Sequence, residues 1–376
     1  MPTNPISTVD PDGLLEFSVV FTDRSLNHMS AAFQAVMRDV SATLKKVYGA
    51  ASVAIVPGGG TYGMESVARQ LATGKRCTVL RNGWFSYRWT QIFEAGGIPA
   101  ESTVLQARRT GDRGDSPFVP APIEEVEAHI AKERPDVVFA PHVETASGIL
   151  LPDDYVRRVA AAVHDVGGLF VLDCIASGTL WVDMRALGVD VLISAPQKGW
   201  SGTPCAGLVM LGERARERVA ATSSTSFAMD LRKWLEIMDA YENGGHAYHA
   251  TVPTDSLRRL RDTMIETERF GFERLRERQI ELGRRVRALL AERGFPSVAG
   301  PGFEAPCVVV SYTQDADIVA AFAKAGLQVA AGVPLMCGEP PDYRAFRIGL
   351  FGLDKLGDVD GTVARLEKGL GQATSA

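Results

Sequence analysis

The sequence predicts an α/β fold in which a mostly parallel sheet lies between layers of helices. Helical segments such as YGMESVARQLA and IEEVEAHIAKE separate most members of a series of short apolar runs. These runs show little polar alternation, which is typical of strands buried on both faces. Alternating strands and helices indicate right-handed crossovers and hence a parallel sheet. The apolar runs are SVAIVP, CTVLRN, DVVFAP, GLFVLDCI, DVLISAP and AGLVML.

Further elements are expected on either side of this region. AAFQAVMRDVSATLKKVYG places its apolar residues on one helical face, and residues 255–293 read as a long charged helical region. After it, APCVVVSYT, LQVAAGV and AFRIGLFG are predicted as strands, and DADIVAAFAKAG and DVDGTVARLEKGLG as helices. We therefore expect an N-terminal arm (1–25), a large domain (26–255) and a small C-terminal α+β domain (256–376) that includes the linking helix.

Composition narrows the class of protein. The 376 residues carry a net charge of −5, which argues against nucleic acid as a main partner. No apolar run reaches the length of a membrane span, and the N-terminus does not read as a signal peptide, so we expect a cytoplasmic protein without a membrane partner. The five cysteines lack CxxC pairing and the six histidines lack metal-binding spacing, so reduced thiols and no metal site are expected.

In open α/β sheets ligands bind beyond the carboxyl ends of the strands, and the first candidates lie there. The glycine-rich VPGGGTYGMES follows one apolar run and opens a helix. Its backbone could hold a phosphate at the helix N-terminus, or it could be an ordinary turn. Phe85, just past the next run, could stack on a planar cofactor or simply pack as core or lid.

Three further strand ends carry polar side chains. PHVETASG offers Glu144, Thr145 and Ser147 for hydrogen bonds to a ligand, or as a helix entry. Asp173 could pair with a protonated heterocyclic nitrogen or cap a helix. Lys198, if partly desolvated, could attack a carbonyl, but taken alone it reads better as a solvated charge at a strand end. A cofactor with a phosphate, a pyridinium ring and an aldehyde would engage them all, and pyridoxal 5′-phosphate has these groups.

Seven motifs also carry a resemblance. GGTYGMES resembles SGTGAMEA, RNGWFSYRW resembles NGxFGxRW, PHVETASGILLP resembles HxETSTGVxxP, VLDCIAS resembles VDxVSS and SAPQKGW resembles SGSQKAL. YHATVP and FRIGLFG match two later motifs. With these in order, the chain resembles the class V aminotransferases of fold type I, in particular the alanine–glyoxylate, serine–pyruvate and serine–glyoxylate aminotransferases. The resemblance implies a seven-stranded, mostly parallel sheet in the large domain, and a homodimer with shared active sites.

The resemblance also implies roles for single residues. Lys198 would form the Schiff base with pyridoxal 5′-phosphate and move a proton between substrate and cofactor, and Asp173 would hold the pyridinium proton. Phe85 would stack on the ring, and Arg347 would bind the substrate carboxylate as a bidentate clamp. The remaining cofactor-binding positions are Gly60, Thr61, Tyr62, Gly63 and Gln197 at the phosphate, Ser147 with Thr145 near the ring hydroxyl, Ile175, and Tyr248 and Thr251 reaching the phosphate of the neighbouring subunit.

Two segments depart from the family pattern. Where relatives have a Gly-Pro-rich segment, this chain has LLEFSVVFTDRSLNHMS. Its polar residues could face a substrate side chain or cap the following helix, with capping favoured for Asn27 and Ser30. The segment GWSGTPCAG after Lys198 is longer than usual and could form one wall of an altered substrate pocket. The other polar residues of the first segment are Thr22, Asp23, Arg24 and His28.

The leading hypothesis is a transaminase that moves an amino group from an amino acid to a 2-oxo acid such as pyruvate or glyoxylate. A lyase, desulfurase or decarboxylase on the same fold is the alternative, and a non-catalytic dimeric homologue is another. Cysteine desulfurases place a histidine where this chain has Gln197, and they need a mobile nucleophilic cysteine. Cys337, in a turn-rich segment, could be offered for that role but reads better as an ordinary loop thiol.

Overall fold

A computed structural model describes residues 8–374 and confirms the α/β class. Its main sheet has the strand order β1-β9-β8-β7-β6-β2-β3. Only β9 runs antiparallel to its neighbours, so the sheet is mostly parallel, as predicted. The strands are β1 (Ser52–Pro57), β2 (Arg76–Arg81), β3 (Glu101–Gln106), β6 (Val137–Pro141), β7 (Leu169–Asp173), β8 (Val191–Ser194) and β9 (Ala206–Leu211).

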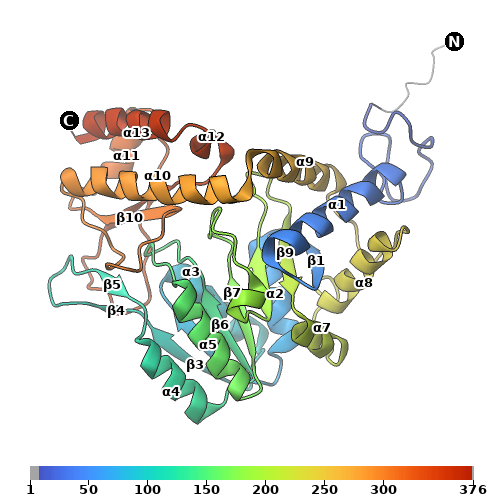
Figure 1. Cartoon of the computed structure of the whole chain (residues 1–376), viewed down its shortest axis with the longest axis horizontal. Helices are drawn as coiled ribbons and strands as arrows, with labels where there is room; N and C mark the ends of the chain where they lie inside the picture. The colour runs from blue at the N-terminus through green and yellow to red at the C-terminus, as the bar shows by residue number, and fades with distance from the viewer. Residues whose placement is uncertain (1–7, 375–376) are drawn as a thin grey trace.

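Helices cover both faces of this sheet, with α5 in front of it in Figure 1. The chain moves across the sheet in one direction from β1 to β2 and in the other from β6 to β8. Right-handed crossovers therefore put the two sets of helices on opposite faces. The helices of this part are α1 (Ala31–Tyr48), α2 (Gly60–Leu71), α3 (Trp84–Gly96), α4 (Ile123–Glu133), α5 (Asp153–Asp165), α6 (Met184–Leu187), α7 (Glu213–Ala220), α8 (Leu231–Glu242) and α9 (Thr254–Phe270).

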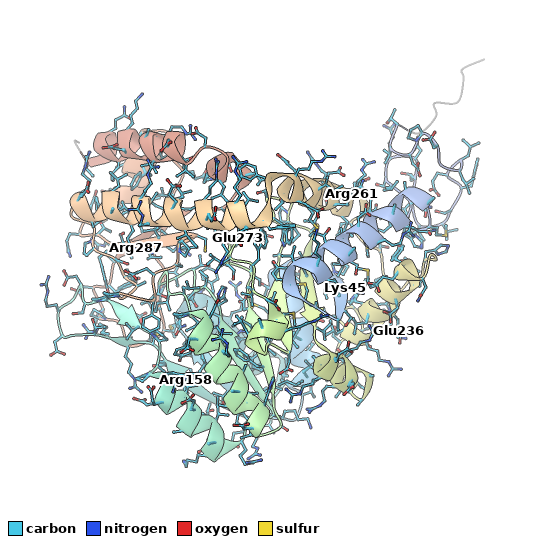
Figure 2. The ribbon with its side chains drawn as sticks, in the orientation of Figure 1. Lys45, Arg158, Glu236, Arg261, Glu273 and Arg287 are labelled. Atoms are coloured by element: carbon cyan, nitrogen blue, oxygen red, sulfur yellow. The ribbon has the colours of Figure 1, made fainter. Side chains whose placement is uncertain are left out.

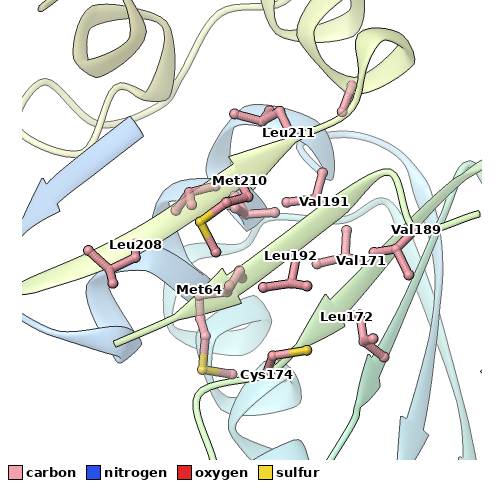
Figure 3. Close-up of a cluster of buried hydrophobic side chains, with 14 of the residues drawn as sticks. Met64, Val171, Leu172, Cys174, Val189, Val191, Leu192, Leu208, Met210 and Leu211 are labelled. Carbon is pink, nitrogen blue, oxygen red and sulfur yellow. The ribbon is translucent and has the colours of Figure 1, made fainter. Parts of the chain in front are cut away.

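The core of the large lobe lies between the sheet and these helices. Figure 3 shows side chains of β7, β8 and β9 packed with Met64 of α2 and with Cys174. Every residue of β8 and β9 is buried, which explains why these strands appear in the sequence as apolar runs without alternation. Packing of this kind fixes the strand ends, where the polar candidates lie.

A smaller lobe follows, built on a three-stranded antiparallel sheet of order β10-β12-β11. Figure 1 shows α10 running through this lobe, with α13 on one side of it and β10 on the other. Arg347 of β12 pairs in register with Val310 of β10 and Ala330 of β11. The elements are α10 (Phe272–Glu292), β10 (Val308–Tyr312), α11 (Ile318–Lys324), β11 (Ala330–Ala331), β12 (Ala345–Gly349), α12 (Leu353–Leu356) and α13 (Val359–Thr374). A short hairpin of β4 (Arg108–Arg109) and β5 (Phe118–Val119) lies at the edge of the large lobe.

Three details differ from the sequence-based expectations. The seventh strand, β3, was not among the apolar runs because it is an edge strand whose residues are exposed or half-buried. The long charged helical region is two helices, since Gly271 adopts φ 101° between α9 and α10. The strand predicted at LQVAAGV shrinks to Ala330–Ala331, both exposed. The proposed domain boundaries stay predictions, although α9 packs on α1 and contributes Leu257 to the large core.

The N-terminal arm contains no helix or strand over residues 8–25; its first residues lie outside the described part of the chain. Within residues 8–374, no helix is long and apolar enough to cross a membrane, and no cluster of His, Cys, Asp or Glu side chains could hold a metal ion. All five cysteines are buried free thiols.

Candidate active site

Four neighbouring strands bring the polar candidates to one edge of the sheet. β8, β7, β6 and β2 are adjacent and parallel, so their carboxyl ends meet at the same edge. Lys198 follows β8, Asp173 ends β7, Glu144 follows β6 and Phe85 follows β2. The loop after β1 leads into α2 near the same edge, because Gly60 abuts Ile175, two residues beyond β7. The structure thus brings together candidates that span 138 residues of sequence, from Gly60 to Lys198.

The glycine-rich turn forms an open helix N-terminus. Gly59 is the N-cap of α2 and offers no side-chain cap. The N–H groups of Tyr62 and Gly63 donate to the Gly59 carbonyl, so those of Gly60 and Thr61 remain available to an anion. A Cβ on Gly60 would lie 2.5 Å from Cδ1 of Ile175, so a larger residue would have to displace that side chain. Gly63 lies against Gly207 of β9 and sets how closely α2 packs on the sheet. Tyr62 is exposed.

An arginine that the motif analysis left without a role joins this turn to α3. Arg88 donates from Nη1 to Oγ1 of Thr61 over 3.0 Å, and its guanidinium lies 5.1 Å from the centre of the Phe85 ring. The sequence signal was the i, i+3 spacing of Phe85 and Arg88, which places both on one face of a helix. Arg88 therefore adds a cation beside the open N-terminus of α2.

Phe85 stands at the centre of a group of cations. Lys198 Nζ lies 6.0 Å from its ring centre and the Arg347 guanidinium lies 5.6 Å from it. Lys198 Nζ is also 5.3 Å from the centre of Phe351, a residue that the sequence analysis did not select. The aromatic ring, the amine and the two guanidinium groups thus occupy one small region.

Glu144 fixes the start of α3 and hence the position of Phe85. The carboxylate is fully buried and accepts hydrogen bonds from the N–H groups of Phe85 (3.1 Å), Ser86 (2.8 Å) and Ala146 (2.9 Å), and from the Ser86 hydroxyl (2.6 Å). These donors compensate the cost of burying a charge. A Cβ on Gly83 would come within 2.7 Å of this side chain, so the turn before α3 needs glycine.

Asp173 is a buried acid with one free oxygen. Its Oδ1 accepts from the Ile175 N–H over 2.9 Å, and its Oδ2 has no donor among residues 8–374. Burial raises the pKa of Asp173 to about 6; the Ile175 N–H lowers it, nearby Glu144 raises it further, and the charges of Lys198 and Arg88 lower it. A protonated ring nitrogen is the kind of group that would complete this arrangement.

Lys198 is held in the crevice without a partner. Its Nζ forms no hydrogen bond or ion pair with the described residues, and burial lowers the pKa of the amine. Asp173 opposes that shift and Arg347 adds to it. A larger share of the amine is therefore neutral, and neutral amines attack aldehydes.

The longer loop after Lys198 turns into the core. Gly199 lies so close to Gly178 that a Cβ would overlap its carbonyl. Trp200 is fully buried against Trp181 and Tyr48, with ring centres at 4.8 and 6.2 Å. Ser201 adopts φ 55° and accepts from the Leu353 N–H over 2.9 Å. The loop is thus packed into the large lobe through Gly199 and Trp200 and bonded to the small lobe through Ser201.

Arg347 reaches the site from β12. Its Nε donates to the Ala331 carbonyl over 2.8 Å, while the two Nη groups have no partner among residues 8–374. Burial lowers the pKa of Arg347, and Glu144 and Tyr343 oppose the shift. The terminal edge of the guanidinium is therefore free to take a carboxylate with two parallel hydrogen bonds.

The remaining predicted cofactor residues are more dispersed. Ser147 is fully buried and donates to the Asn82 carbonyl over 2.7 Å, whereas Thr145 is half-buried. Gln197 is exposed beside Lys198. Tyr248 and Thr251 are exposed and bonded to each other through their hydroxyls over 3.0 Å.

The divergent N-terminal segment packs against this Tyr248 region. The His28 ring is buried, with its centre 5.4 Å from that of Tyr248. Ser30 caps α1 by accepting from the Phe33 N–H, as favoured from the sequence. Asn27 instead holds the arm, since its Nδ2 donates to Glu16 over 2.8 Å. Thr22, Asp23 and Arg24 lie in the arm; Arg24 is exposed and pairs with Asp23 at 3.9 Å.

Cys337 does not have the properties of a mobile nucleophile. Its thiol is buried and donates to the Arg81 carbonyl over 3.4 Å, and burial raises its pKa to about 12. A thiol with so high a pKa is almost entirely protonated near neutral pH. This environment weighs against the desulfurase alternative.

The residues at the strand ends fit pyridoxal 5′-phosphate. The uncapped N-terminus of α2 suits a phosphate, Asp173 offers a free oxygen to a ring nitrogen, and Lys198 offers an unpaired amine. Phe85 presents a flat ring between them. Fold and site together define a class of protein, the fold type I enzymes that use this cofactor.

Comparison with known proteins identifies the family. The class V aminotransferase family matches residues 16–342. The chain is 29% identical over 339 residues to 2-aminoethylphosphonate–pyruvate transaminase 2 of Paraburkholderia xenovorans, covering 88% of this chain and 86% of that protein. It is 24% identical to alanine–glyoxylate aminotransferase of Rattus norvegicus, covering 88% and 78%. The crystal structure of alanine–glyoxylate aminotransferase from Nostoc sp. superimposes with a TM-score of 0.78 at 20% identity, covering 93% and 89%.

The chain belongs to the class V aminotransferases, which are enzymes dependent on pyridoxal 5′-phosphate. This confirms the family, the fold and the cofactor that the seven sequence motifs indicated.

Proposed function

We propose that this enzyme transfers an amino group from an amino acid to a 2-oxo acid such as pyruvate or glyoxylate. The observation that carries the proposal is the unpaired, partly desolvated amine of Lys198 beside Asp173, Phe85 and Arg347. Relatives named for pyruvate and for glyoxylate as acceptors support it. When bound, the cofactor supplies an aldehyde and an electron-withdrawing ring that stabilises negative charge at the substrate Cα.

Lys198 and Asp173 carry the chemistry in this proposal. Lys198 would hold the cofactor covalently through its Nζ and would move a proton between the substrate Cα and the cofactor, as general base and then general acid. Its lowered pKa favours the neutral amine that attachment of the cofactor and acceptance of the proton require. Asp173 would accept a hydrogen bond from the protonated ring nitrogen at its free Oδ2 and so keep that proton in place.

The other residues bind and orient. The backbone at Gly60, Thr61 and Gly63 holds the phosphate, with Tyr62 and Gln197 beside it. Phe85, held by Glu144, supports the ring, and Ile175 and Ser147 line the site. Arg347 clamps the carboxylate common to the donor and the acceptor, which lets one site serve both half-reactions.

We also propose that the active unit is a homodimer. Tyr248 and Thr251 are exposed, and the resemblance assigns them to the phosphate of the neighbouring subunit. Exposed apolar residues of the arm and of the loop between α7 and α8 supply further surface for such an interface: Leu14, Leu15, Phe17, Val19 and Phe227. Sedimentation of the holoenzyme tests this, and a monomer that retains full activity would refute it. The cytoplasm as the protein's compartment stays a prediction from the sequence.

A panel of amino donors against pyruvate and glyoxylate tests the function. Consumption of donor matched by formation of alanine or glycine supports transamination; release of ammonia or carbon dioxide with no amino product contradicts it. Borohydride reduction followed by peptide mapping tests the attachment separately. The reduced cofactor is expected on Lys198, and its recovery on another residue would overturn that assignment.

A further inference from the structure

A second concave site lies between the two lobes, lined by residues other than the strand-end candidates described above. It is a cleft of about 1020 Å³ between α10 and the large-lobe segments around Pro152 and Val182. Lys198, Asp173, Phe85 and Arg347 do not line it. The volume lies at the upper limit of the pockets that hold small organic ligands. The cleft is therefore a separate site with walls from both lobes.

Two arginines on the α10 wall lack a carboxylate partner. Arg287 donates from Nη2 to the Ala305 carbonyl over 2.8 Å, but its Nη1 is buried and has no hydrogen-bond partner. Figure 2 shows Arg287 below α10, on the side of the large lobe. Arg284, one turn earlier, is exposed and forms no ion pair with residues 8–374. Residues three apart lie side by side on a helix, so the two guanidinium groups share one face.

Most acidic residues of the cleft are already engaged. Glu273 pairs with Arg276 at 3.6 Å, Asp183 caps α6 by accepting two N–H groups, and Glu304 accepts from the Gly302 N–H over 2.8 Å. Asp153 lies in the first turn of α5, where the positive end of the helix offsets its charge. Burial lowers the pKa of Arg287 and the nearby Glu304 carboxylate raises it, so the charge of Arg287 is offset only in part. Because Nη1 of Arg287 has no hydrogen-bond partner and Arg284 forms no ion pair within residues 8–374, the region around the two arginines favours an anion.

Apolar side chains adjoin the two arginines. Ile280, four residues before Arg284 on the same helix, is 46% exposed and lines the cleft. Leu150 lies on the opposite wall and donates its N–H to the Phe303 carbonyl. Two residues further on, the Ala305 carbonyl accepts from Arg287, so one short segment contacts both Leu150 and Arg287. Charged and apolar surface thus meet at the same end of the cleft.

We propose that this end of the cleft binds a small organic anion, with a carboxylate against Arg284 and Arg287 and an apolar body against Ile280 and Leu150. The site goes beyond the proposed transamination and does not depend on it. Guanidinium groups bind carboxylates with paired, charge-assisted hydrogen bonds, and the apolar body gains from leaving water.

Benzoate is a suitable probe because it joins a carboxylate to an apolar ring. Titration calorimetry is performed on holoenzyme carrying Arg347→Gln, which removes the carboxylate clamp of the active site. Arg284→Gln and Arg287→Gln are added singly, and Arg285→Gln serves as the matched control, because Arg285 pairs with Glu281 and Asp360 outside the cleft. Benzamide tests the need for charge, and inorganic phosphate tests the need for the apolar body.

We expect saturable benzoate binding in the Arg347→Gln background, weakened about tenfold by either cleft substitution and unchanged by Arg285→Gln. Benzamide and phosphate should bind at least tenfold more weakly. Arg284 is exposed, so its variant keeps the test valid if Arg287→Gln folds poorly. Thermal unfolding gives a second readout, since benzoate should raise the melting temperature only where Arg284 is intact. Benzoate binding that vanishes with Arg347→Gln alone, or that survives both cleft substitutions, would overturn the proposal.

Discussion

The strand-end site and the interlobe cleft differ in how fully their buried charged groups are hydrogen-bonded. At the strand ends the fully buried carboxylate of Glu144 receives four hydrogen bonds, and Asp173 lies near the cations Lys198 and Arg88. In the cleft, Arg287 has a buried nitrogen with no partner. In the first site the buried acid that positions Phe85 has all its hydrogen bonds without a ligand. In the cleft a buried guanidinium nitrogen has none, and a bound anion would supply one. Within the first site, the groups without a partner among residues 8–374 include three that would touch cofactor or substrate: Lys198 Nζ, Asp173 Oδ2 and the Nη groups of Arg347.

The largest effect is expected from Lys198→Ala, which removes the unpaired amine. Transamination should fall by about 10⁴-fold or more, because attachment of the cofactor and proton transfer both depend on this residue. Steady-state rates with a saturating donor measure it. Lys355→Ala is the matched control, since Lys355 lies on the surface of α12 and pairs with Asp354. Retention of more than a tenth of the activity in Lys198→Ala would show that another group performs these tasks.

Arg347→Gln should reduce kcat/KM by about 10³-fold for donors that carry a carboxylate, because two charge-assisted hydrogen bonds are lost. Arg344→Gln should leave kcat/KM within about twofold, since the exposed Arg344 only donates to the Gln314 carbonyl. An equal loss of kcat/KM with a donor that lacks a carboxylate would contradict this, because it would show that Arg347 maintains the structure of the site and does not bind the substrate carboxylate.

Glu144→Gln removes part of the hydrogen bonding that holds the start of α3. Its amide would face two of the four donors that the carboxylate now satisfies, which should lower the free energy of unfolding by about 3 to 4 kcal/mol. Urea unfolding of the apoprotein measures it. The exposed Glu236→Gln, labelled in Figure 2, should cost less than about 0.5 kcal/mol. If both variants were equally stable, the hydrogen bonds at the start of α3 would not support the site.

Asp173→Asn is expected to have the smallest effect among these site variants, and its effect on the free energy of unfolding should depend on pH. The folded-state pKa of Asp173, about 6, lies above that of an unfolded aspartate, so the folded apoprotein binds more protons between about pH 4 and 6. The stability of wild type should therefore fall across that window and stay low above it. Asp173→Asn should gain up to about 3 kcal/mol over wild type at pH 8 and nothing at pH 4. Chemical denaturation of both proteins at several pH values measures this difference in stability. A difference that stays the same at every pH would contradict the prediction.

The sequence predicted the fold well where burial was continuous. β8 and β9 are wholly buried, and their apolar runs could be recognised without any partner strand. β3 was missed because an edge strand with exposed and half-buried residues has no such run. The break at Gly271 was missed because a charged periodic pattern continues on both sides of a single glycine.

The candidate site was predicted from motifs at strand ends, which local sequence can reveal. Contacts between distant segments could not be predicted in this way. Arg88 reaches Thr61 across 27 residues of sequence, and Glu144 reaches Ser86 across 58. The same limit applies to Asn27, which was expected to cap a helix and instead holds Glu16 in the arm. Side-chain contacts of this kind depend on the packing of whole elements.

The most direct test of the proposed function is a single-turnover reaction of the holoenzyme with an amino donor and no acceptor. The proposal predicts one equivalent of 2-oxo acid per active site and conversion of the cofactor to pyridoxamine phosphate, with the amino group recovered on pyruvate or glyoxylate when either is added. Release of ammonia, sulfide or carbon dioxide with the cofactor returned as pyridoxal phosphate would contradict the proposal and establish the lyase alternative.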